Sequence, residues 1–275
     1  MTAIPLTWLY VPGDRPEVVS KALVCGADVV VVDLEDAVAP DRKEYARTAT
    51  AERLTDPQPV PVHVRINALD GPLATPDLQS LEGLPGLSGL RLPKVTAPQE
   101  VVRVATRGTA PGIGLHALLE TALGIEHAFA IATAHTALQG IALGEADLRA
   151  DLGVREDAGL DWCRSRVVVA ARAAGLAPPP QSVHPDTLDL DTLAASCARG
   201  RALGFLGRAA IHPRQLPVIE RAYLPTPEEI EEAEQIVKAA ATDEGAQALP
   251  NGRFIDAAVV ATARRTLSLA DRDRP

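Results

Sequence analysis

Carboxylate side chains follow several short apolar runs of this sequence, where they could bind a metal ion. Asp33, Glu35 and Asp36 come after the run VVVV, and Glu120 and Asp147 follow two later runs. Two carboxylates completed by water suit Mg²⁺, which prefers oxygen ligands and keeps several waters. Either Glu120 or Asp147 alone is equally well read as a residue at a helix N-terminus. Both together, at the ends of neighbouring strands, favour a magnesium site.

A basic side chain, Arg65, follows the run PVHV and is expected at the same rim. Its guanidinium could stabilise a developing enolate oxygen, or it could form a structural ion pair with Glu35 or Asp36. The residue types leave both interpretations open. Because alternating strand residues face opposite sides, Asp33, Glu35 and Asp36 cannot all enter one cavity, so at least one caps a helix or supports a neighbour.

Other basic residues lie in the first and second loops of this pattern. Arg15 stands beside the tight turn at Pro12, and Lys21 and Lys43 follow. Such a group could receive the phosphates of a nucleotide-containing ligand, whereas a solvated helix face explains any single one equally well. Of the three, Arg15 is the strongest candidate.

Histidines and cysteines give no comparable site. We interpret four lone histidines as hydrogen-bonded structural residues: His63, His116, His127 and His135. The sequence leaves the role of His212 open. No order of Ser, His and Asp or of Cys and His stands out, so covalent acyl catalysis has little support.

Eight apolar runs, each followed by a crossover segment, must position these residues. The runs are LTWLYVPG, ADVVVVDLED, PVHVRINA, GLRLPKV, GIGLHALLE, LQGIALGEAD, PQSVHPD and GRAAIHP. This alternation is typical of parallel strands joined by helices, and 275 residues suit a single α/β barrel domain. We therefore expect an α/β fold, a (β/α)8 TIM barrel with extra C-terminal helices, formed by residues 1–275. An open doubly wound sheet is the alternative, but its glycine-rich phosphate motif is missing after the first run.

The segment 225–275 exceeds what a barrel needs. It begins with an acidic amphipathic helix for which Thr226 is the predicted cap and Pro227 the first residue. A turn and a final helix follow. We expect this extension to serve oligomerisation or to complete the active site, although a plain packing role fits the pattern as well.

Composition excludes several classes of protein. Apolar residues make up 47% and aromatic residues 3%, which is typical of a core of aliphatic side chains between buried parallel strands. The formal charge of −9 argues against a nucleic-acid partner. No apolar run is long enough for a membrane span, no leader is evident, and three scattered cysteines predict neither a disulfide framework nor a zinc site. We expect an unprocessed cytoplasmic protein.

The ordered blocks LYVPGDRP, VVDLEDAVAPDRK, VHVRIN, LPKV, LLET, LGEAD, AIHPRQ and RFID resemble the citrate lyase beta subunit and its relatives, the malyl-CoA and citramalyl-CoA lyases of the HpcH/HpaI aldolase superfamily. The match spans nearly the whole chain. The resemblance implies a TIM barrel assembled as a homotrimer or hexamer, with Mg²⁺ held by Glu120 and Asp147. It assigns oxyanion stabilisation to Arg65 and coenzyme A contacts to Arg15 and Lys21.

The resemblance also singles out Asp256, which the pattern alone predicts to be a helix cap. In coenzyme A-dependent relatives the corresponding aspartate enters the active site of a neighbouring subunit and acts as the base. Pro180 and Gln181 stand where relatives commonly carry an Ile-Asp pair, and His184 where many have an aromatic residue. These departures concern the acyl or acid side of the pocket and leave the predicted metal site and Arg65 untouched.

Together these features predict a magnesium-dependent carbon–carbon lyase, or a synthase in reverse, that cleaves a 3-hydroxyacyl-CoA such as citramalyl-CoA or malyl-CoA. The products would be acetyl-CoA and a small 2-keto acid, with Glu120 contacting substrate through the metal and Glu35 and Asp36 orienting Arg65 or metal-bound water. The alternatives are a citrate lyase beta subunit that cleaves citryl-acyl carrier protein to oxaloacetate, an aldolase of free keto acids, and a non-catalytic thioester-binding protein.

Overall fold

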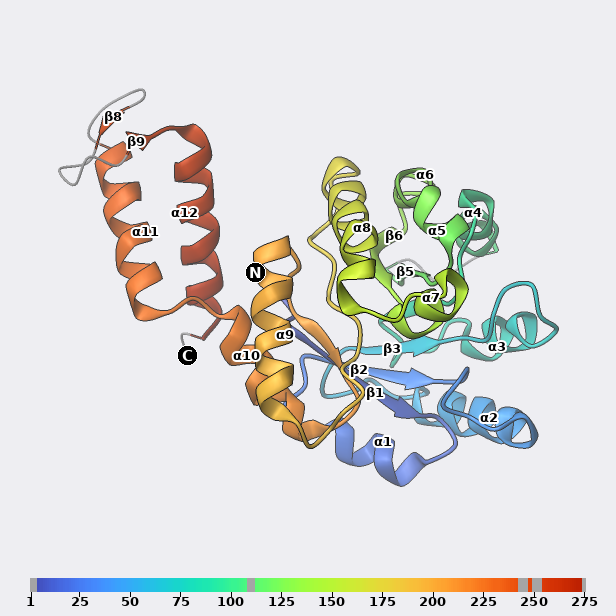
Figure 1. Ribbon diagram of the computed structural model, residues 1–275. Coiled ribbons are helices and arrows are strands. Elements are labelled where there is room, and N and C mark those ends of the chain that lie inside the picture. Colours follow the sequence, from blue (N-terminus) through green and yellow to red (C-terminus); the bar gives the residue numbers. More distant parts are fainter. Residues whose placement is uncertain (1–3, 108–111, 242–246, 249–253, 274–275) are drawn as a thin grey trace. The chain divides into compact units, whose positions relative to one another are not determined.

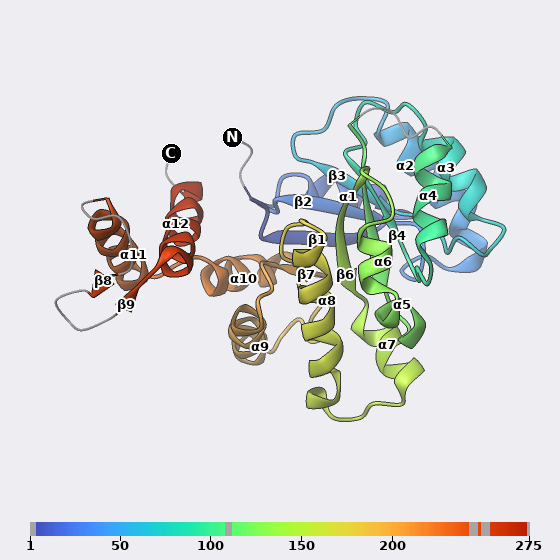
Figure 2. The same cartoon turned by 90° about the horizontal axis from the view of Figure 1, so that it is seen from above.

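The computed structural model describes residues 4–107, 112–241, 247–248 and 254–273 (Figures 1 and 2). The chain divides into two compact units, one formed by Pro5–Ala222 and the other by Met1–Ile4 with Tyr223–Pro275. The larger unit carries a parallel sheet and the smaller one a pair of helices. Every helix in the part of the chain that the structure describes is too short or too polar to cross a membrane.

Seven parallel strands form a curled sheet in the larger unit (Figure 1). They are β1 (Thr7–Pro12), β2 (Val29–Asp33), β3 (Val62–Arg65), β4 (Gly89–Leu92), β5 (Gly114–Leu119), β6 (Leu138–Leu143) and β7 (Arg208–Ala210). Their order is β6-β5-β4-β3-β2-β1-β7. Sequential strands are thus neighbours from β1 to β6, and their carboxyl ends share one edge of the sheet.

Burial explains why these runs form strands. All five residues of β2 are buried, and β4 is buried along its whole length. Such uninterrupted apolar runs are typical of parallel strands covered on both faces. Pairing places Asp33, Arg65, Arg91 and His116 in register on β2, β3, β4 and β5. Four polar side chains therefore occupy one level of the sheet.

The expected closed (β/α)8 barrel is wrong, because the described sheet has seven strands and leaves β6 and β7 at its edges. The run 180–186, expected as a strand, contributes one isolated bridge between Gln181 and Arg208 of β7. Three prolines at 178–180 precede this bridge, and a proline has no amide hydrogen to donate to a ladder. The fold remains α/β, and the other seven predicted runs contain β1 to β7.

Helices and short helical turns connect the strands of the larger unit. They are α1 (Pro16–Ala22), α2 (Lys43–Arg53), α3 (Ala74–Leu81), α4 (Pro98–Thr106), α5 (Ala122–Glu126), α6 (Ala128–Ala132), α7 (Glu145–Leu152), α8 (Asp161–Ala173), α9 (Leu190–Leu203) and α10 (Leu216–Tyr223), with the 3₁₀ turns η1 (Pro40–Arg42), η2 (Asp157–Leu160) and η3 (Pro213–Gln215). Contacts join α2 to α3, α4 to α6, α6 to α8 and α8 to α9, and Figure 2 shows this succession. The helices therefore cover the outer face of the sheet.

The smaller unit is built on α11 (Pro227–Ala240) and α12 (Ala257–Ala270), with the short strands β8 (Gln247–Ala248) and β9 (Phe254–Ile255) and the turn η4 (Asp271–Asp273). Thr226 caps α11 by accepting a hydrogen bond from the Glu229 amide at 3.2 Å, as predicted. The two helices pack through Ala233, Ile236 and Ala263. Apolar burial thus holds this unit together.

Candidate active site

A cavity of about 350 Å³ opens at the carboxyl ends of the strands. Its walls come from all seven strands β1 to β7, from the start of α7 and from the segment at 180–183. The charged residues that line it in the described part of the chain are Asp33, Asp36, Arg65, Arg91, Glu120, Glu145 and Asp147. Four of the site residues predicted at the strand ends, Asp36, Arg65, Glu120 and Asp147, therefore face one common space, whereas Glu35 does not line it.

Asp33 anchors the loop that follows β2. Its carboxylate accepts hydrogen bonds from the backbone amides of Glu35 at 2.8 Å and Ala37 at 3.0 Å. Lys43 closes the same loop by donating its Nζ to the carbonyl oxygens of Leu34 at 2.8 Å and Glu35 at 2.6 Å. A buried carboxylate with two amide donors is well fixed, so Asp33 gives its neighbours a firm partner.

Arg65 binds Asp33 through two hydrogen bonds, from Nε at 2.8 Å and from Nη2 at 2.6 Å. Its Nη1 lies 3.1 Å from Glu35 and 3.6 Å from Asp36. Burial opposes the charge, but the bond to Asp33 and the nearby carboxylate of Glu35 raise the pKa of Arg65 above its ordinary value. The guanidinium is therefore charged and held in one orientation, which suits a group that must meet a developing negative charge.

Lys94 joins the two carboxylate groups of the site. Its Nζ lies 2.7 Å from Glu35 and 3.4 Å from Asp36, while its backbone amide donates to Glu120 Oε2 at 3.0 Å. Lys94 has a φ of 53°, which is uncommon for a residue other than glycine. This backbone strain aims the amide at Glu120, and strained residues of this kind cluster at functional sites.

Glu120 is buried, with 2% of its surface exposed. Burial, with a further contribution from Glu35, raises the pKa of Glu120 to about 8. Gly144 is needed beside it, since a Cβ at that position would lie 2.4 Å from Glu120 Oε1. A buried carboxylate crowded by other carboxylates is stabilised by a cation.

Asp147 lies half-buried in the first turn of α7 and faces the same cavity as Glu120. Within the described residues no group of three or more His, Cys, Asp or Glu side chains forms a metal cluster. Two carboxylates that leave room for water nevertheless fit Mg²⁺, which commonly binds one or two protein carboxylates. The pair thus fits the predicted ion by donor type.

The start of α7 is braced by an ion-pair network. Arg164 on α8 binds Glu145 through Nε at 2.9 Å and Nη2 at 2.6 Å, and it also contacts Asp157 at 2.8 Å. These hydrogen bonds raise the pKa of Arg164 and hold the pKa of Asp157 well below its usual range. Hydrogen bonds from α8 therefore hold the turn that carries Asp147 in place.

The remaining predicted residues lie in different places. Arg15 is exposed at the residue before α1, and Lys21 is exposed in the last turn of that helix. Asp256 belongs to the smaller unit, where it accepts hydrogen bonds from the amides of Ala258 and Val259 and caps α12. The pattern predicted this capping role, whereas entry into a partner's active site stays a prediction.

Residues that the sequence did not single out also line the cavity, chiefly Tyr10 and Arg91. The Tyr10 ring lies 5.5 Å from the Arg65 guanidinium carbon and 5.7 Å from that of Arg91. Arg91 stands within a strand rather than at its end. Its signal was a charged residue between two leucines in GLRLPKV, at a position that side-chain alternation places on the face of Arg65.

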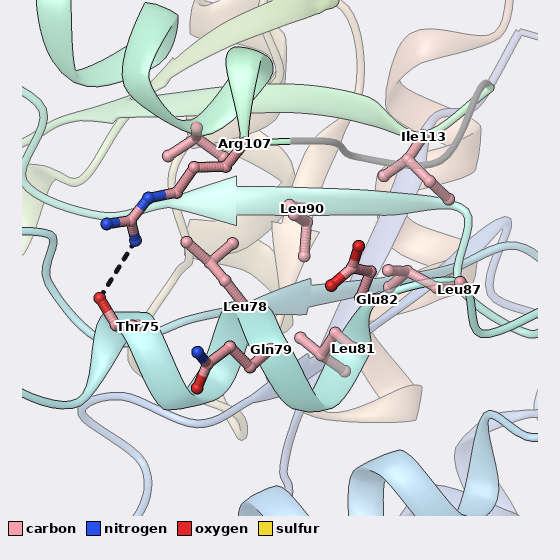
Figure 3. A pocket seen from close by; sticks show the side chains of 11 residues that line it. Thr75, Leu78, Gln79, Leu81, Glu82, Leu87, Leu90, Arg107 and Ile113 are labelled. Carbon is pink, nitrogen blue, oxygen red and sulfur yellow. Dashed lines mark hydrogen bonds between the residues drawn. The ribbon is translucent and has the colours of Figure 1, made fainter.

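A second hollow of about 270 Å³ lies outside the sheet, beside α3, α4 and β4 (Figure 3). Leucine side chains form much of its lining, and Arg107 donates a hydrogen bond to Thr75 at 3.1 Å. Glu82 is the single carboxylate among the described lining residues. The groups suited to catalysis are therefore at the strand-end cavity.

Comparison with known proteins adds to this geometry. A sequence profile of the family HpcH/HpaI aldolase/citrate lyase matches residues 6–213. The chain is 34% identical to the citrate lyase subunit beta of Escherichia coli over 281 residues, which cover 96% of this chain and 92% of the relative. It is also 34% identical to a (3S)-malyl-CoA thioesterase of Cereibacter sphaeroides over 278 residues, which cover 96% and 93% of the two chains.

Among solved structures, the protein CitE from Mycobacterium tuberculosis superimposes with a TM-score of 0.84 at 34% identity. The alignment covers 98% of this chain and 99% of that protein. That structure is a complex with magnesium, acetoacetate and coenzyme A. The likeness therefore includes both the sheet and the C-terminal segment.

Proposed function

The chain belongs to the HpcH/HpaI aldolase/citrate lyase family, and from this premise we propose that it is a magnesium-dependent carbon–carbon lyase. The substrate would be a 3-hydroxyacyl-CoA such as citramalyl-CoA or malyl-CoA, cleaved to acetyl-CoA and a 2-keto acid. The observation that carries this proposal is the convergence of Glu120, Asp147 and Arg65 on one cavity. The magnesium and coenzyme A bound to the similar CitE protein support it.

Glu120 and Asp147 would hold the ion. When bound, Mg²⁺ supplies a Lewis acid for the oxygens of the keto acid unit. Glu120 offers Oε1 for this purpose, because Oε2 already accepts the Lys94 amide. Glu145 and Arg164 keep the turn with Asp147 in place.

Arg65 would stabilise the enolate oxygen of the acetyl-CoA product. During cleavage the hydroxyl proton would pass to water in the cavity, the hydroxyl-bearing carbon would become the keto carbon as its bond to the carbon next to the thioester breaks, and the electron pair of that bond would form the enolate, with negative charge on the thioester oxygen. A guanidinium held by Asp33 and Glu35 meets that charge without reorganising, which is the condition for strong electrostatic catalysis.

Asp256 would supply the proton that the enolate takes up at its methyl carbon. Asp256 belongs to the smaller unit. From the resemblance to coenzyme A-dependent relatives we propose that it reaches the cavity of another copy in a trimer or hexamer. Arg15, at the start of α1, would contact the phosphates of coenzyme A, with Lys21 further along the helix. We propose a cytoplasmic setting for this reaction.

Two other reactions compete with this proposal, each favoured by a particular relative. Similarity to the (3S)-malyl-CoA thioesterase of Cereibacter sphaeroides favours hydrolysis of the thioester. Similarity to the Escherichia coli citrate lyase subunit beta favours the citrate lyase reaction, for which the family resemblance implies an acyl carrier protein as the carrier. Hydrolysis would release a hydroxy acid and free coenzyme A. Cleavage of the carbon–carbon bond releases a keto acid and acetyl-CoA.

The test is a product assay on the purified chain with malyl-CoA, citramalyl-CoA and hydroxymethylglutaryl-CoA, with Mg²⁺ and then with EDTA. We expect one ester to yield keto acid and acetyl-CoA in equal amounts, and EDTA to stop the reaction. Free coenzyme A with an intact hydroxy acid would instead establish a thioesterase. No turnover of any free ester would favour the acyl carrier protein or a binding protein.

A further inference from the structure

Tyr10, on β1, places a phenol between two guanidiniums of the cavity. Its ring centre lies 5.5 Å from the guanidinium carbon of Arg65 and 5.7 Å from that of Arg91. The ring packs against a buried cluster that includes Trp8 and Val31, so apolar contacts fix its position. Tyr10, Arg65 and Arg91 all line the cavity. Arg65 has a role in the proposed cleavage, whereas Tyr10 and Arg91 have none so far.

The two guanidiniums beside Tyr10 differ in how their charge is balanced. Arg65 donates from Nε and Nη2 to Asp33, and its Nη1 lies 3.1 Å from Glu35. Arg91 is 2% exposed, and among the described residues no carboxylate lies within ion-pair distance of it and its Nε has no acceptor. A buried charge without a counterion is costly. Arg91 therefore keeps a positive charge that is available to stabilise a negative charge formed in the cavity.

Arg91 directs this charge at the hydroxyl group of Tyr10. Its Nη1 donates to the hydroxyl oxygen at 3.4 Å, and catalytic hydrogen bonds are often this long before substrate binds. A hydroxyl that accepts from a cation becomes a stronger donor itself, because hydrogen bonds in a chain polarise one another. In the described part of the chain the Tyr10 hydroxyl has no acceptor for its own hydrogen. That hydrogen is therefore available to a ligand in the cavity.

We propose that Tyr10 donates a hydrogen bond to the thioester oxygen as the enolate forms, beside Arg65, and that Arg91 orients and polarises the Tyr10 hydroxyl. This inference rests on the proposed function, because it concerns the same carbon–carbon cleavage. The phenol keeps its proton, so the negative charge stays on the enolate until the methyl carbon is protonated. Tyr10 is then a catalytic residue, and Arg91 is a positioning residue that acts through it.

The test is the rate at which Tyr10→Phe releases keto acid from the ester that the wild type cleaves, at saturating Mg²⁺. This variant removes one oxygen atom and keeps the ring that packs on Trp8. We expect kcat to fall at least about tenfold, because a donor to a developing oxyanion acts mainly in the transition state. KM, and the Kd of acetyl-CoA from calorimetry, should change less than about twofold.

Tyr45→Phe is the matched control. Tyr45 is an exposed tyrosine on α2, and its ring also lies beside a guanidinium, that of Arg42 at 4.2 Å. Removal of this hydroxyl should leave kcat unchanged. Thermal unfolding of both variants at the wild-type temperature shows that a lower kcat does not come from a loss of fold.

A double-mutant cycle separates the parts of Tyr10 and Arg91. Arg91→Met should lower kcat less than Tyr10→Phe does, and in the Tyr10→Phe background it should lower kcat no further, because the hydroxyl through which Arg91 acts is gone. Losses that multiply in the double variant would overturn the part assigned to Arg91. If Arg91→Met does not fold, Arg91→Lys takes its place in the cycle with the same expectation.

The outcomes for Tyr10 are distinct from those for the proposed function. Wild-type kcat in Tyr10→Phe would overturn the inference and leave the lyase proposal intact. A raised KM with unchanged kcat would overturn it as well, because Tyr10 would then contact the substrate equally before and during cleavage. A wild-type chain that cleaves none of the three esters would overturn both.

Discussion

Arg65 and Arg91 lie on neighbouring strands at one level of the sheet, but their surroundings are opposite. Arg65 meets Asp33, Glu35 and Asp36, whereas Arg91 meets aromatic rings. The three carboxylates hold the Arg65 guanidinium in one orientation and balance its charge. On the aromatic side, Arg91 has no carboxylate partner among the described residues. Two identical side chains therefore differ in charge environment because of the residues beside them.

The largest expected effect comes from removing the main partner of Arg65. Asp33→Asn places an amide group where two backbone amides and a guanidinium all donate, so donors would face donors. We expect a loss of about 3 kcal/mol in the free energy of unfolding, the usual scale for breaking a buried ion pair. Urea unfolding measures it. Asp36→Asn, at an exposed carboxylate, should lower the free energy of unfolding far less. Equal losses for the two variants would contradict the view that the buried Asp33 is the main partner of Arg65.

Comparable in size is the effect of Arg65 itself on turnover. Arg65→Ala should lower kcat by a factor of about 10² to 10³, the usual effect of losing an oxyanion donor. Release of keto acid from the ester that the wild type cleaves measures it, after circular dichroism has verified folding. Arg103→Ala on the exposed face of α4 is the control. An Arg65→Ala chain with full kcat would leave Arg65 a structural residue only.

The buried histidines near Arg91, His63 and His116, should make the stability of the fold depend on pH. Burial, the neighbouring His116 and Arg91 lower the pKa of His63 well below its ordinary value, and burial and Arg91 lower that of His116 to about 3. The unfolded chain therefore binds more protons below pH ~6.5. Stability should be complete above that pH and fall on acidification, by at most about 1.4 kcal/mol per pH unit for each histidine.

Thermal unfolding between pH 7.5 and 4.5 measures this dependence. His63→Gln should flatten the pH profile, because it removes one group that the folded chain keeps neutral. His127→Gln changes an exposed histidine and should leave the slope as it is. A His63→Gln slope identical to that of the wild type would show that the buried His63 does not contribute to the loss of stability at low pH.

The smallest effect is expected at the rim outside both regions. Arg15→Ala should weaken coenzyme A binding about twofold to fivefold, the scale of an exposed ion pair. Lys21→Ala should have a smaller effect, since Lys21 lies in the last turn of α1, away from the strand ends. Fluorescence displacement of a coenzyme A analogue measures both effects. A larger effect for Lys21→Ala than for Arg15→Ala would contradict the proposal that Arg15 is the main contact of the phosphates.

Much of the fold could be predicted because buried parallel strands are written as apolar runs. The valines of β2 and the Thr226 cap of α11 are local signals that the structure confirms. The failure of the sheet to close into a barrel was not predictable in this way. Three prolines at 178–180 remove ladder donors just where an eighth strand was expected, and a single bridge at Gln181 remains.

The strand-end residues of the site could be predicted because parallel strands end at one edge. Glu120, Asp147 and Arg65 follow apolar runs and line one cavity. Arg91 escaped because it stands inside a run, where its orientation depends on cross-strand register. The strained backbone of Lys94 and the Arg164 network also depend on contacts between distant segments that no local pattern specifies.

The central claim is that a cation completes the carboxylate side of the cavity, and titration of Mg²⁺ into the purified chain tests it most directly. The wild type and Glu126→Gln, an exposed glutamate on α5, should bind one ion per chain with equal affinity. Glu120→Gln should bind it at least about tenfold more weakly, because one of two charged ligands is lost. Unchanged affinity in Glu120→Gln would contradict the claim.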